Sequence, residues 1–374
     1  MKKYGIRLLF PFILLLFLSG CWNYSELNER TIIAGAAIDL TESGEIQLTA
    51  ETIDFGNGDS PSMESKVLTG RGQSIADAVH DIMNQSGKEL YWFHATLLVL
   101  DNDYAERGIR EVLDYILNEH EMRLTLTLAV SRLDTAAEVF DLECHGSKIK
   151  SFAITSVIEE QSELGKTVRS DAYDTINRML EPGAEFALTQ IMGEVAGGTG
   201  TVDISGCGIF LEDKLTGWLN AEETILLQLL SKSVRRAEFD FPVDDAHLSV
   251  NVEDWKVRAE PALQNHGVEM ELHIAGRYEV LLIDGELDVK DPAVAERVAG
   301  ALGRYLESHL EDLTEYLQEV PCDVFGWGNL LWQRNPEAYR TFPSWYDAFG
   351  RIETHVTTDF RSSSGSAGAG ILLR

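Results

Sequence analysis

The segment from residue 292 to residue 320 most strongly constrains the fold of this chain. Its leucines recur at the three- and four-residue spacing of one helix face, and they are Leu302, Leu306, Leu310, Leu313 and Leu317. Asp291 is suited to cap the start of such a helix, and Pro292 suits its first position. At about 1.5 Å per residue the helix would be roughly 43 Å long. We therefore expect a long helix lying on a sheet.

Shorter patterns predict the remaining elements. Apolar or alternating runs of strand length occupy residues 31–39, 45–53, 91–100, 123–130, 185–195, 201–211, 247–259, 268–283 and 351–360. Apolar residues at helical spacing occupy residues 74–86, 109–117, 147–160 and 167–180. Residues 54–72 form a polar stretch without clear periodicity, and a composition shift at residues 237–245 favours a linker. The expected fold class is α+β or mixed α/β.

The length of 374 residues leaves room for two or three domains, each large enough to bury a core. We predict three mixed sheet-and-helix domains, the last of which carries the long helix packed on a sheet. The predicted boundaries are a signal peptide at residues 1–20, an N-terminal α/β domain at 21–185, a middle β-rich region at 186–240, a C-terminal α+β domain at 241–361 and a flexible tail at 362–374.

The start of the chain has the features of a secretory signal. Lys2, Lys3 and Arg7 flank an apolar run from residue 8 to residue 18, which is shorter than the roughly 20 residues of a membrane-spanning helix. The following Leu18-Ser19-Gly20-Cys21 resembles the bacterial lipobox. This resemblance implies cleavage before Cys21, a diacylglycerol on its sulfur and further acylation, for example with palmitate, so that lipid chains hold the protein at a membrane. The alternative is an ordinary signal peptide followed by a cysteine by chance.

The charge balance limits the possible partners. The chain has a formal net charge of −30, and without residues 1–20 it keeps 28 basic and 61 acidic side chains, a net charge of −33. Such a surface repels phosphate backbones, so we expect no nucleic-acid partner. Apart from Cys21 the cysteines are Cys144, Cys207 and Cys322, and the sequence leaves open one disulfide plus a free thiol or three buried thiols.

No motif in the sequence indicates catalysis. Gly165-Lys166-Thr167 imitates the end of a phosphate-binding loop, but Glu160 occupies the position that needs glycine. The nine histidines are scattered, and His94 is expected to be a satisfied buried imidazole. Acidic clusters at residues 54–59 and 284–291 do not follow the calcium-loop template. We therefore predict neither an enzyme nor a bound metal or cofactor.

Several sequence blocks resemble a known family. Cys21-Trp22-Asn23-Tyr24-Ser25-Glu26-Leu27-Asn28 is similar to the opening of the Ger(x)C lipoproteins, the C subunits of spore germination receptors. Further similar blocks are Gly87-Lys88-Glu89-Leu90 with Phe93-His94, Arg123-Leu124-Thr125, and Asp323-Val324-Phe325-Gly326-Trp327-Gly328 followed by Arg334 and Trp345. The resemblance implies three mixed α/β domains without known catalytic activity. It also implies a lipid-anchored subunit of a nutrient receptor on the outer face of the spore inner membrane, together with membrane-embedded A and B subunits.

The last of these blocks supplies the candidate partner-contact residues, which are Asp323, Gly326, Trp327 and Gly328. The structural alternative is that Asp323 caps the next helix while the glycines allow a close approach of the backbone. We expect a scaffold or signalling subunit that acts through broad surfaces.

Two other classes of protein remain open from the sequence. A solute-binding lipoprotein of a transporter would share the anchor and the acidic surface, but it should consist of two similar α/β lobes around one cleft. A membrane-tethered hydrolase would need His94, His145 or His273 beside a carboxylate and a reactive side chain in a cleft.

Overall fold

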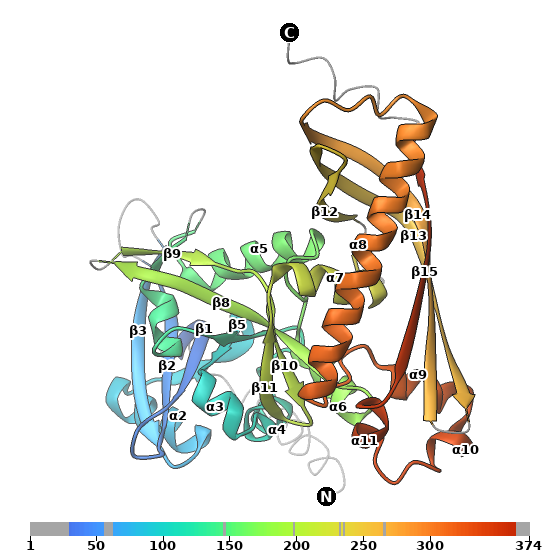
Figure 1. The fold of residues 1–374 in the computed structure, drawn as a ribbon. Coiled ribbons are helices and arrows are strands. Elements are labelled where there is room, and N and C mark those ends of the chain that lie inside the picture. Colours follow the sequence, from blue (N-terminus) through green and yellow to red (C-terminus); the bar gives the residue numbers. More distant parts are fainter. Residues whose placement is uncertain are drawn as a thin grey trace, which may run out of the picture.

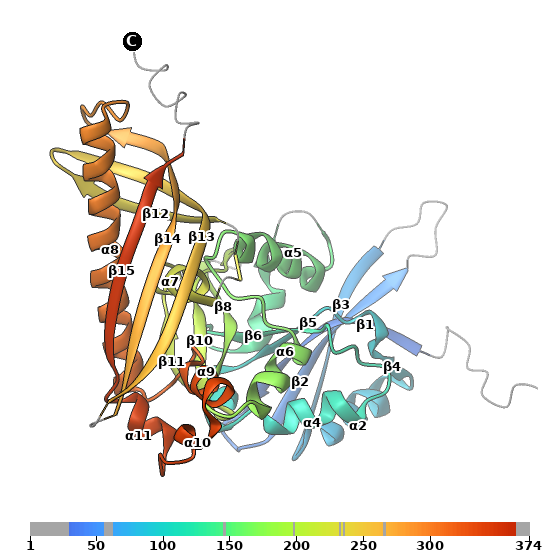
Figure 2. The ribbon, with the colours of Figure 1, turned by 90° about the vertical axis from the view of Figure 1, so that its right-hand side faces the viewer.

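The computed structural model describes residues 30–55, 63–144, 147–196, 199–231, 233–234, 236–264 and 267–363. Figures 1 and 2 show two sheets side by side: a large, helix-covered sheet formed by the first part of the chain, and a narrower sheet that carries the long helix. The fold class is α+β, as predicted. Cys21 and the predicted signal peptide lie outside the described residues.

The first sheet has eleven strands, and its main path runs in the order β11-β10-β8-β6-β5-β1-β2-β3. The central strands β1, β5, β6 and β8 pair in parallel, whereas the outer strands pair antiparallel. Short strands β4, β7 and β9 lie off this path. The strands are β1 (Arg30–Leu40), β2 (Ile46–Phe55), β3 (Met63–Gly72), β4 (Glu89–Tyr91), β5 (Leu97–Leu100), β6 (Thr127–Ser131), β7 (Leu142–Glu143), β8 (Phe186–Ala196), β9 (Thr199–Asp203), β10 (Cys207–Leu211) and β11 (Lys214–Leu219).

Helices cover both faces of this sheet, so its central strands are apolar on both sides. In β1, Ala36 and Ile38 belong to one core, while Ala37 between them belongs to the other. The first core is closed by α2 (Ile75–Ser86), α3 (Asn102–Arg107), α4 (Arg110–Asn118) and α6 (Ala172–Leu180). The second is closed by the 3₁₀ helix η3 (Ala136–Phe140) and by α5 (Lys150–Glu163).

The second sheet has the order β12-β13-β14-β15, with strands β12 (Arg236–Val243), β13 (Ala246–Gln264), β14 (Gly267–Asp284) and β15 (Glu353–Ser362). The long helix α8 (Pro292–Glu319) packs on it (Figure 2). All five predicted leucines are at most 1% exposed, and Asp291 accepts a hydrogen bond from Ala293 N at 2.8 Å. The prediction of a long helix on a sheet is therefore confirmed.

The remaining helices lie where the two sheets meet. They are α7 (Ala221–Ser231), α9 (Trp327–Arg334), α10 (Pro336–Tyr339) and α11 (Trp345–Phe349). Both views place α6 of the first sheet beside α9 (Figures 1 and 2). The core of the second sheet also includes Cys207 and Ile209 of β10, whereas Phe210 of the same strand belongs to the first sheet. Apolar packing is thus continuous from one sheet to the other.

Several sequence predictions need correction. Residues 237–245 are not a linker, because they contain β12, whose Ala237, Phe239, Phe241 and Val243 alternate into the core. The polar stretch 54–72 contains β3, a largely exposed outer strand paired with β2. The strands predicted at 91–100 and 201–211 are each interrupted, the second at Gly206, where φ is 85° and a Cβ would collide with the Leu219 carbonyl oxygen.

The strand predicted at 123–130 begins only at Thr127. The sequence patterns do not predict the helices α3 and α7 or the strand β11. Strands β8 to β11, which fall largely in the predicted middle region, belong to the same sheet as β1 to β6. The division of the chain into three domains stays a prediction.

Candidate functional site

The predicted site residues lie in the loop that follows α8 and in the first turn of α9. The Asp323 side chain is fully buried and its carboxylate accepts four hydrogen bonds. Oδ1 accepts from Gly326 N at 2.9 Å and from Trp327 N at 3.1 Å, while Oδ2 accepts from Gly328 N at 2.7 Å and from Trp345 Nε1 at 2.8 Å. Asp323 therefore binds the unpaired amides at the start of α9 and also holds α11 in place.

Burial and these hydrogen bonds have opposite effects on the pKa of Asp323. Removal from water raises the pKa of its carboxyl to about 6, although the amide and indole donors favour the charged form. No described Lys or Arg forms an ion pair with it. The carboxylate is therefore held by neutral donors.

A second buried carboxylate, Glu185, lies next to this loop at the start of β8. Its Oε1 accepts from Tyr346 Oη at 2.8 Å and its Oε2 accepts from Glu212 N at 2.7 Å. The main chains also meet, because Glu185 N donates to the Asp323 carbonyl oxygen at 3.2 Å. Burial, together with a smaller effect of the nearby Asp323 charge, raises the pKa of Glu185 to about 7, although the Tyr346 and Glu212 donors lower it. This pair joins the first sheet to the loop after α8.

Two glycines bring the backbones of this region into direct contact. A Cβ on Gly328 would lie 2.5 Å from Trp345 Cε2 and 2.6 Å from the Gly183 carbonyl oxygen. Asn329 N donates to the same carbonyl at 2.8 Å. Gly183 itself has φ 66°, a conformation that side chains disfavour. Any larger residue at position 328 would push α9 away from α6 and α11.

The four predicted residues therefore lie together, but they face inward. Asp323, Trp327 and Gly328 are buried and Gly326 is half-buried. The hydrogen bonds and the close backbone approach support the capping role, which was the structural alternative to a partner contact. A contact of these residues with a partner stays a prediction. Sequence reasoning missed Glu185, for which the only local signal is its position two residues after Gly183 and directly before an apolar strand.

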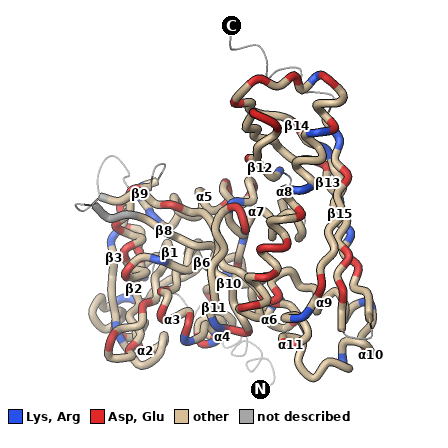
Figure 3. Tube along the Cα trace, in the orientation of Figure 1, with Lys and Arg blue, Asp and Glu red and all other residues tan. Residues whose placement is uncertain are grey.

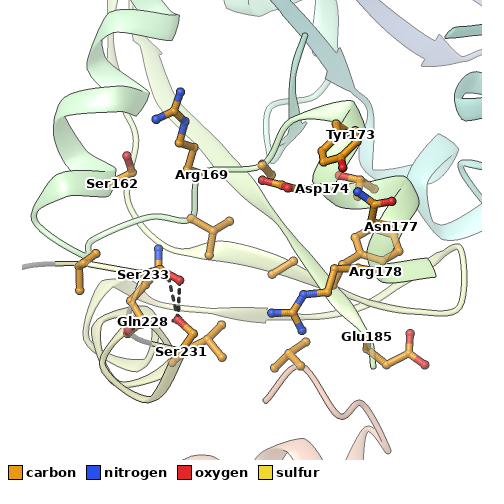
Figure 4. Close-up of a pocket in the computed structure, with 18 of the residues that line it drawn as sticks. Ser162, Arg169, Tyr173, Asp174, Asn177, Arg178, Glu185, Gln228, Ser231 and Ser233 are labelled. Carbon is orange, nitrogen blue, oxygen red and sulfur yellow. Dashed lines mark hydrogen bonds between the residues drawn. The ribbon is translucent and has the colours of Figure 1, made fainter. Parts of the chain in front are cut away.

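Two hollows flank this region on the side of α6. The first, of about 1330 Å³, lies between α6 and the ends of α5 and α7. Figure 4 shows Arg178 extending from α6 toward the end of α7 that carries Ser231. The second, of about 980 Å³, lies between β13 and α9 and shares Arg178, Glu181 and Ser231 with the first. The two hollows therefore lie next to each other, with Arg178 between them.

Of the histidines proposed for a hydrolase, His94 and His273 form no ion pair with a carboxylate among the described residues. His94 is exposed, contrary to the predicted burial, and its ring contacts Tyr91 and Phe93. His94 ends the short 3₁₀ helix η2 (Trp92–His94), which turns it outward while Trp92 points into the core. His273 is exposed on β14, with Nδ1 3.1 Å from Thr357 Oγ1. His145 lies outside the described residues.

The part of the chain that the structure describes contains no group of three His, Cys, Asp or Glu side chains placed to hold a metal ion. Within the same ranges, no helix has both the length and the apolar character needed to cross a membrane. Cys144, Cys207 and Cys322 are free thiols, and the last two are buried. Burial raises the pKa of Cys207 to about 12 and that of Cys322 well above its ordinary value. These two thiols act as small apolar groups.

Comparison with known proteins identifies the family. The model described as "Spore germination protein N-terminal domain" matches residues 23–192, and the model described as "Spore germination B3/GerAC like, C-terminal" matches residues 205–363. The chain therefore belongs to the Ger(x)C family, the germinant receptor C subunits, as its sequence blocks suggested.

Individual relatives support this assignment. Spore germination protein KC of Bacillus subtilis (strain 168) is 22% identical over 88% of both chains. The putative spore germination protein YfkR of the same organism is 20% identical over 95% of both. The crystal structure of the GerBC protein superimposes with a TM-score of 0.58 at 16% identity, and covers 88% of this chain and 96% of that one. The fold is thus shared across nearly the whole length of the GerBC structure.

Proposed function

We propose that this chain is the lipid-anchored C subunit of a nutrient germinant receptor on the outer face of the spore inner membrane. It contributes to germination as a scaffold or signalling subunit, in contact with membrane-embedded A and B subunits. The observation that carries the proposal is the order of its parts: the first family region begins at residue 23, directly after Leu18-Ser19-Gly20-Cys21. A chain acylated on Cys21 would hold the first sheet close to the membrane, because only eight residues separate Cys21 from the start of β1 at Arg30.

The interior of the molecule supports a role without catalysis. The buried carboxylates described above bind backbone amides, a tyrosine hydroxyl and an indole, so they organise helices and loops. The two sheets are also unlike each other in strand number, pairing and helix cover. The solute-binding alternative called for two similar lobes around one cleft, and this arrangement does not resemble them.

The anchor is tested by replacing Cys21. We expect Cys21→Ala to prevent incorporation of an alkyne-labelled palmitate and to leave the protein unprocessed or released from the membrane fraction. Cys144→Ala is the matched control, because it removes a half-buried thiol outside the lipobox sequence and should keep both label and membrane binding. Normal labelling of the Cys21→Ala protein would contradict the anchor.

The receptor role is tested separately. Purification of the lipidated protein in mild detergent should retain membrane-embedded receptor subunits, which mass spectrometry identifies. Deletion of the gene should impair germination triggered by at least one nutrient. Normal responses to every nutrient, combined with purification of the protein alone, would argue against the receptor assignment.

A further inference from the structure

The hollow between β13 and α9 gathers basic side chains in a strongly acidic protein. Its lining includes Arg178 from α6, Lys256 and Arg258 from β13, and Arg334 at the end of α9, against the single carboxylate of Glu181. The whole chain, by contrast, has 61 acidic and 31 basic residues. Figure 3 shows acidic residues recurring along both parts of the molecule. We call this hollow the β13–α9 groove.

Three of these four cations form no close ion pair among the described residues, although the Asp174 carboxylate acts on Arg178 from a longer distance. Arg258 lies 3.8 Å from Glu260, but Arg178, Lys256 and Arg334 form neither an ion pair nor a side-chain hydrogen bond there. Lys256 and Arg334 are exposed and Arg178 is half-buried. Lys256 and Arg258 leave the exposed face of β13, opposite the buried Val257, and so stand at the rim of the groove. The excess of basic over acidic residues in the lining favours a bound anion.

The floor of the groove includes buried apolar side chains. Val257 and Leu272 of the second sheet are buried beneath it, and Trp327 is only 3% exposed. The half-buried Phe325 stacks on the Trp327 ring with centroids 4.6 Å apart. An apolar base with a few charged groups at its rim is typical of a preformed recognition site.

The spacing of the cations indicates the size of the anionic partner. Arg178 Nη1 lies 3.3 Å from the position that a Cβ on Gly326 would take, directly before the first residue of α9. Arg334 is the last residue of that helix. Eight helical steps correspond to about 12 Å along the helix axis, so Arg178 and Arg334 stand at opposite ends of α9. In an extended peptide, side chains four residues apart lie on the same face at about 13 Å.

We propose that the β13–α9 groove binds an extended acidic peptide segment of a partner protein, with carboxylates about four residues apart that pair with Arg178 and Arg334. Lys256 and Arg258 on β13 supply further charge along the same segment. The groove is concave, which suits a single extended chain better than a flat bilayer. The inference concerns the groove alone, and it holds whether or not Cys21 is lipidated.

The test uses the full-length protein in detergent and fluorescein-labelled peptides, with binding followed by fluorescence anisotropy. A (Ser-Glu)₆ peptide should bind and a (Ser-Gln)₆ peptide should not. The measurement is made at about 0.15 M salt, where charges more than about 8 Å apart are largely screened and the local charge of the groove decides binding. In a glutamine-rich host peptide, two glutamates at positions i and i+4 should bind more tightly than two adjacent glutamates.

Matched charge reversals locate the site. We expect Lys256→Glu/Arg334→Glu to weaken binding of the (Ser-Glu)₆ peptide by about tenfold or more, because two attractions become repulsions. Lys290→Glu/Arg340→Glu makes the same change in net charge at exposed positions outside the groove, and should weaken binding less than about twofold. Circular dichroism should show both variants folded, since all four side chains are exposed.

Three results would overturn the inference. One is equal weakening by the two double variants, because net charge alone would then explain binding. Another is the lack of (Ser-Glu)₆ binding by the folded wild-type protein. The last is displacement of the peptide by free glutamate, inorganic phosphate or phosphatidylglycerol vesicles as effectively as by unlabelled peptide, which would indicate a small-anion or lipid site.

Discussion

The first sheet and the junction between the sheets use buried carboxylates in different ways. Within the first half, Asp39 accepts from Ala136 N at 2.5 Å and Ala137 N at 3.3 Å. Glu51 accepts from the main-chain amides of residues 150 and 151, both at 2.7 Å, and from Ser151 Oγ at 2.6 Å. Each of these acids fixes the start of one helix over its own sheet. At the junction, Asp323 and Glu185 instead lie together and connect elements of both halves. Buried carboxylates therefore hold helices onto the first sheet in one region, and connect the two sheets at the junction.

The largest expected effect comes from removing the junction aspartate. Asp323→Ala removes four hydrogen bonds and leaves three buried donors without an acceptor, since Gly326 N keeps its bond to the main-chain carbonyl of residue 323. We expect it to lower the free energy of unfolding by on the order of 4 kcal/mol. Glu51→Ala removes three hydrogen bonds and Asp39→Ala removes two, so their losses should be progressively smaller. Urea unfolding followed by circular dichroism measures all three.

Glu286→Ala is the control for this series, because Glu286 is exposed and should change stability by less than about 0.5 kcal/mol. A loss for Asp323→Ala no larger than that for Asp39→Ala would break the comparison. It would mean that the junction depends little on its buried acid.

A smaller loss is expected from a single methyl group at the close backbone contact. Gly328→Ala should destabilise the protein by about 2 kcal/mol, because the new Cβ would overlap Trp345 and the Gly183 carbonyl. Gly300→Ala, within α8, is the matched control: its Cβ would meet only Arg304 Nη1 at 3.4 Å, and alanine favours helix by up to about 1 kcal/mol. Thermal unfolding of the two variants should therefore shift in opposite directions, and a neutral Gly328→Ala would show that α9 can move freely.

The smallest effect concerns pH. Glu185 has a pKa raised to about 7 in the folded protein, so the folded state keeps a proton that the unfolded state has already released. Its contribution to stability therefore falls as pH rises through the window between its ordinary value and about 7. Glu185→Gln should make the fall in unfolding free energy across this window shallower, as measured by urea titrations at several pH values. Asp323, with a pKa raised to about 6, continues to act in the same direction, so some slope should remain. If the pH dependence of the unfolding free energy is unchanged in Glu185→Gln, protonation of Glu185 does not contribute to it.

Features encoded by neighbouring residues could be predicted from the sequence. The helix α8 ends within one residue of its predicted end, since its leucine stripe and the Asp291 cap are local signals. The capping role of Asp323 was also accessible, because its amide donors follow within five residues. The family blocks allow the fold class to be predicted for the same reason, because each block is a short run of neighbouring residues.

Features that depend on distant pairing could not be predicted. The sequence predicts a linker where β12 lies, because Pro242 and the acidic residues obscure the apolar alternation. A proline is tolerated at this position because β12 is an edge strand. The role of Glu185 depends on Tyr346, which lies 161 residues further along the chain. The β13–α9 groove likewise needs residues from α6, β13 and α9 to converge, and no local pattern contains that information.

The pairing of β8 with β10 has a consequence for how the chain can be divided. The first family region ends at residue 192 within β8, and the second begins at residue 205, just before β10, yet these strands are hydrogen-bonded neighbours in one sheet. A fragment ending at residue 192 would lose β10 and β11 and leave β8 with a bare, largely apolar edge that invites aggregation. The two halves are therefore expected to fold as one cooperative unit, in which the later-synthesised strands complete a sheet begun by the earlier ones.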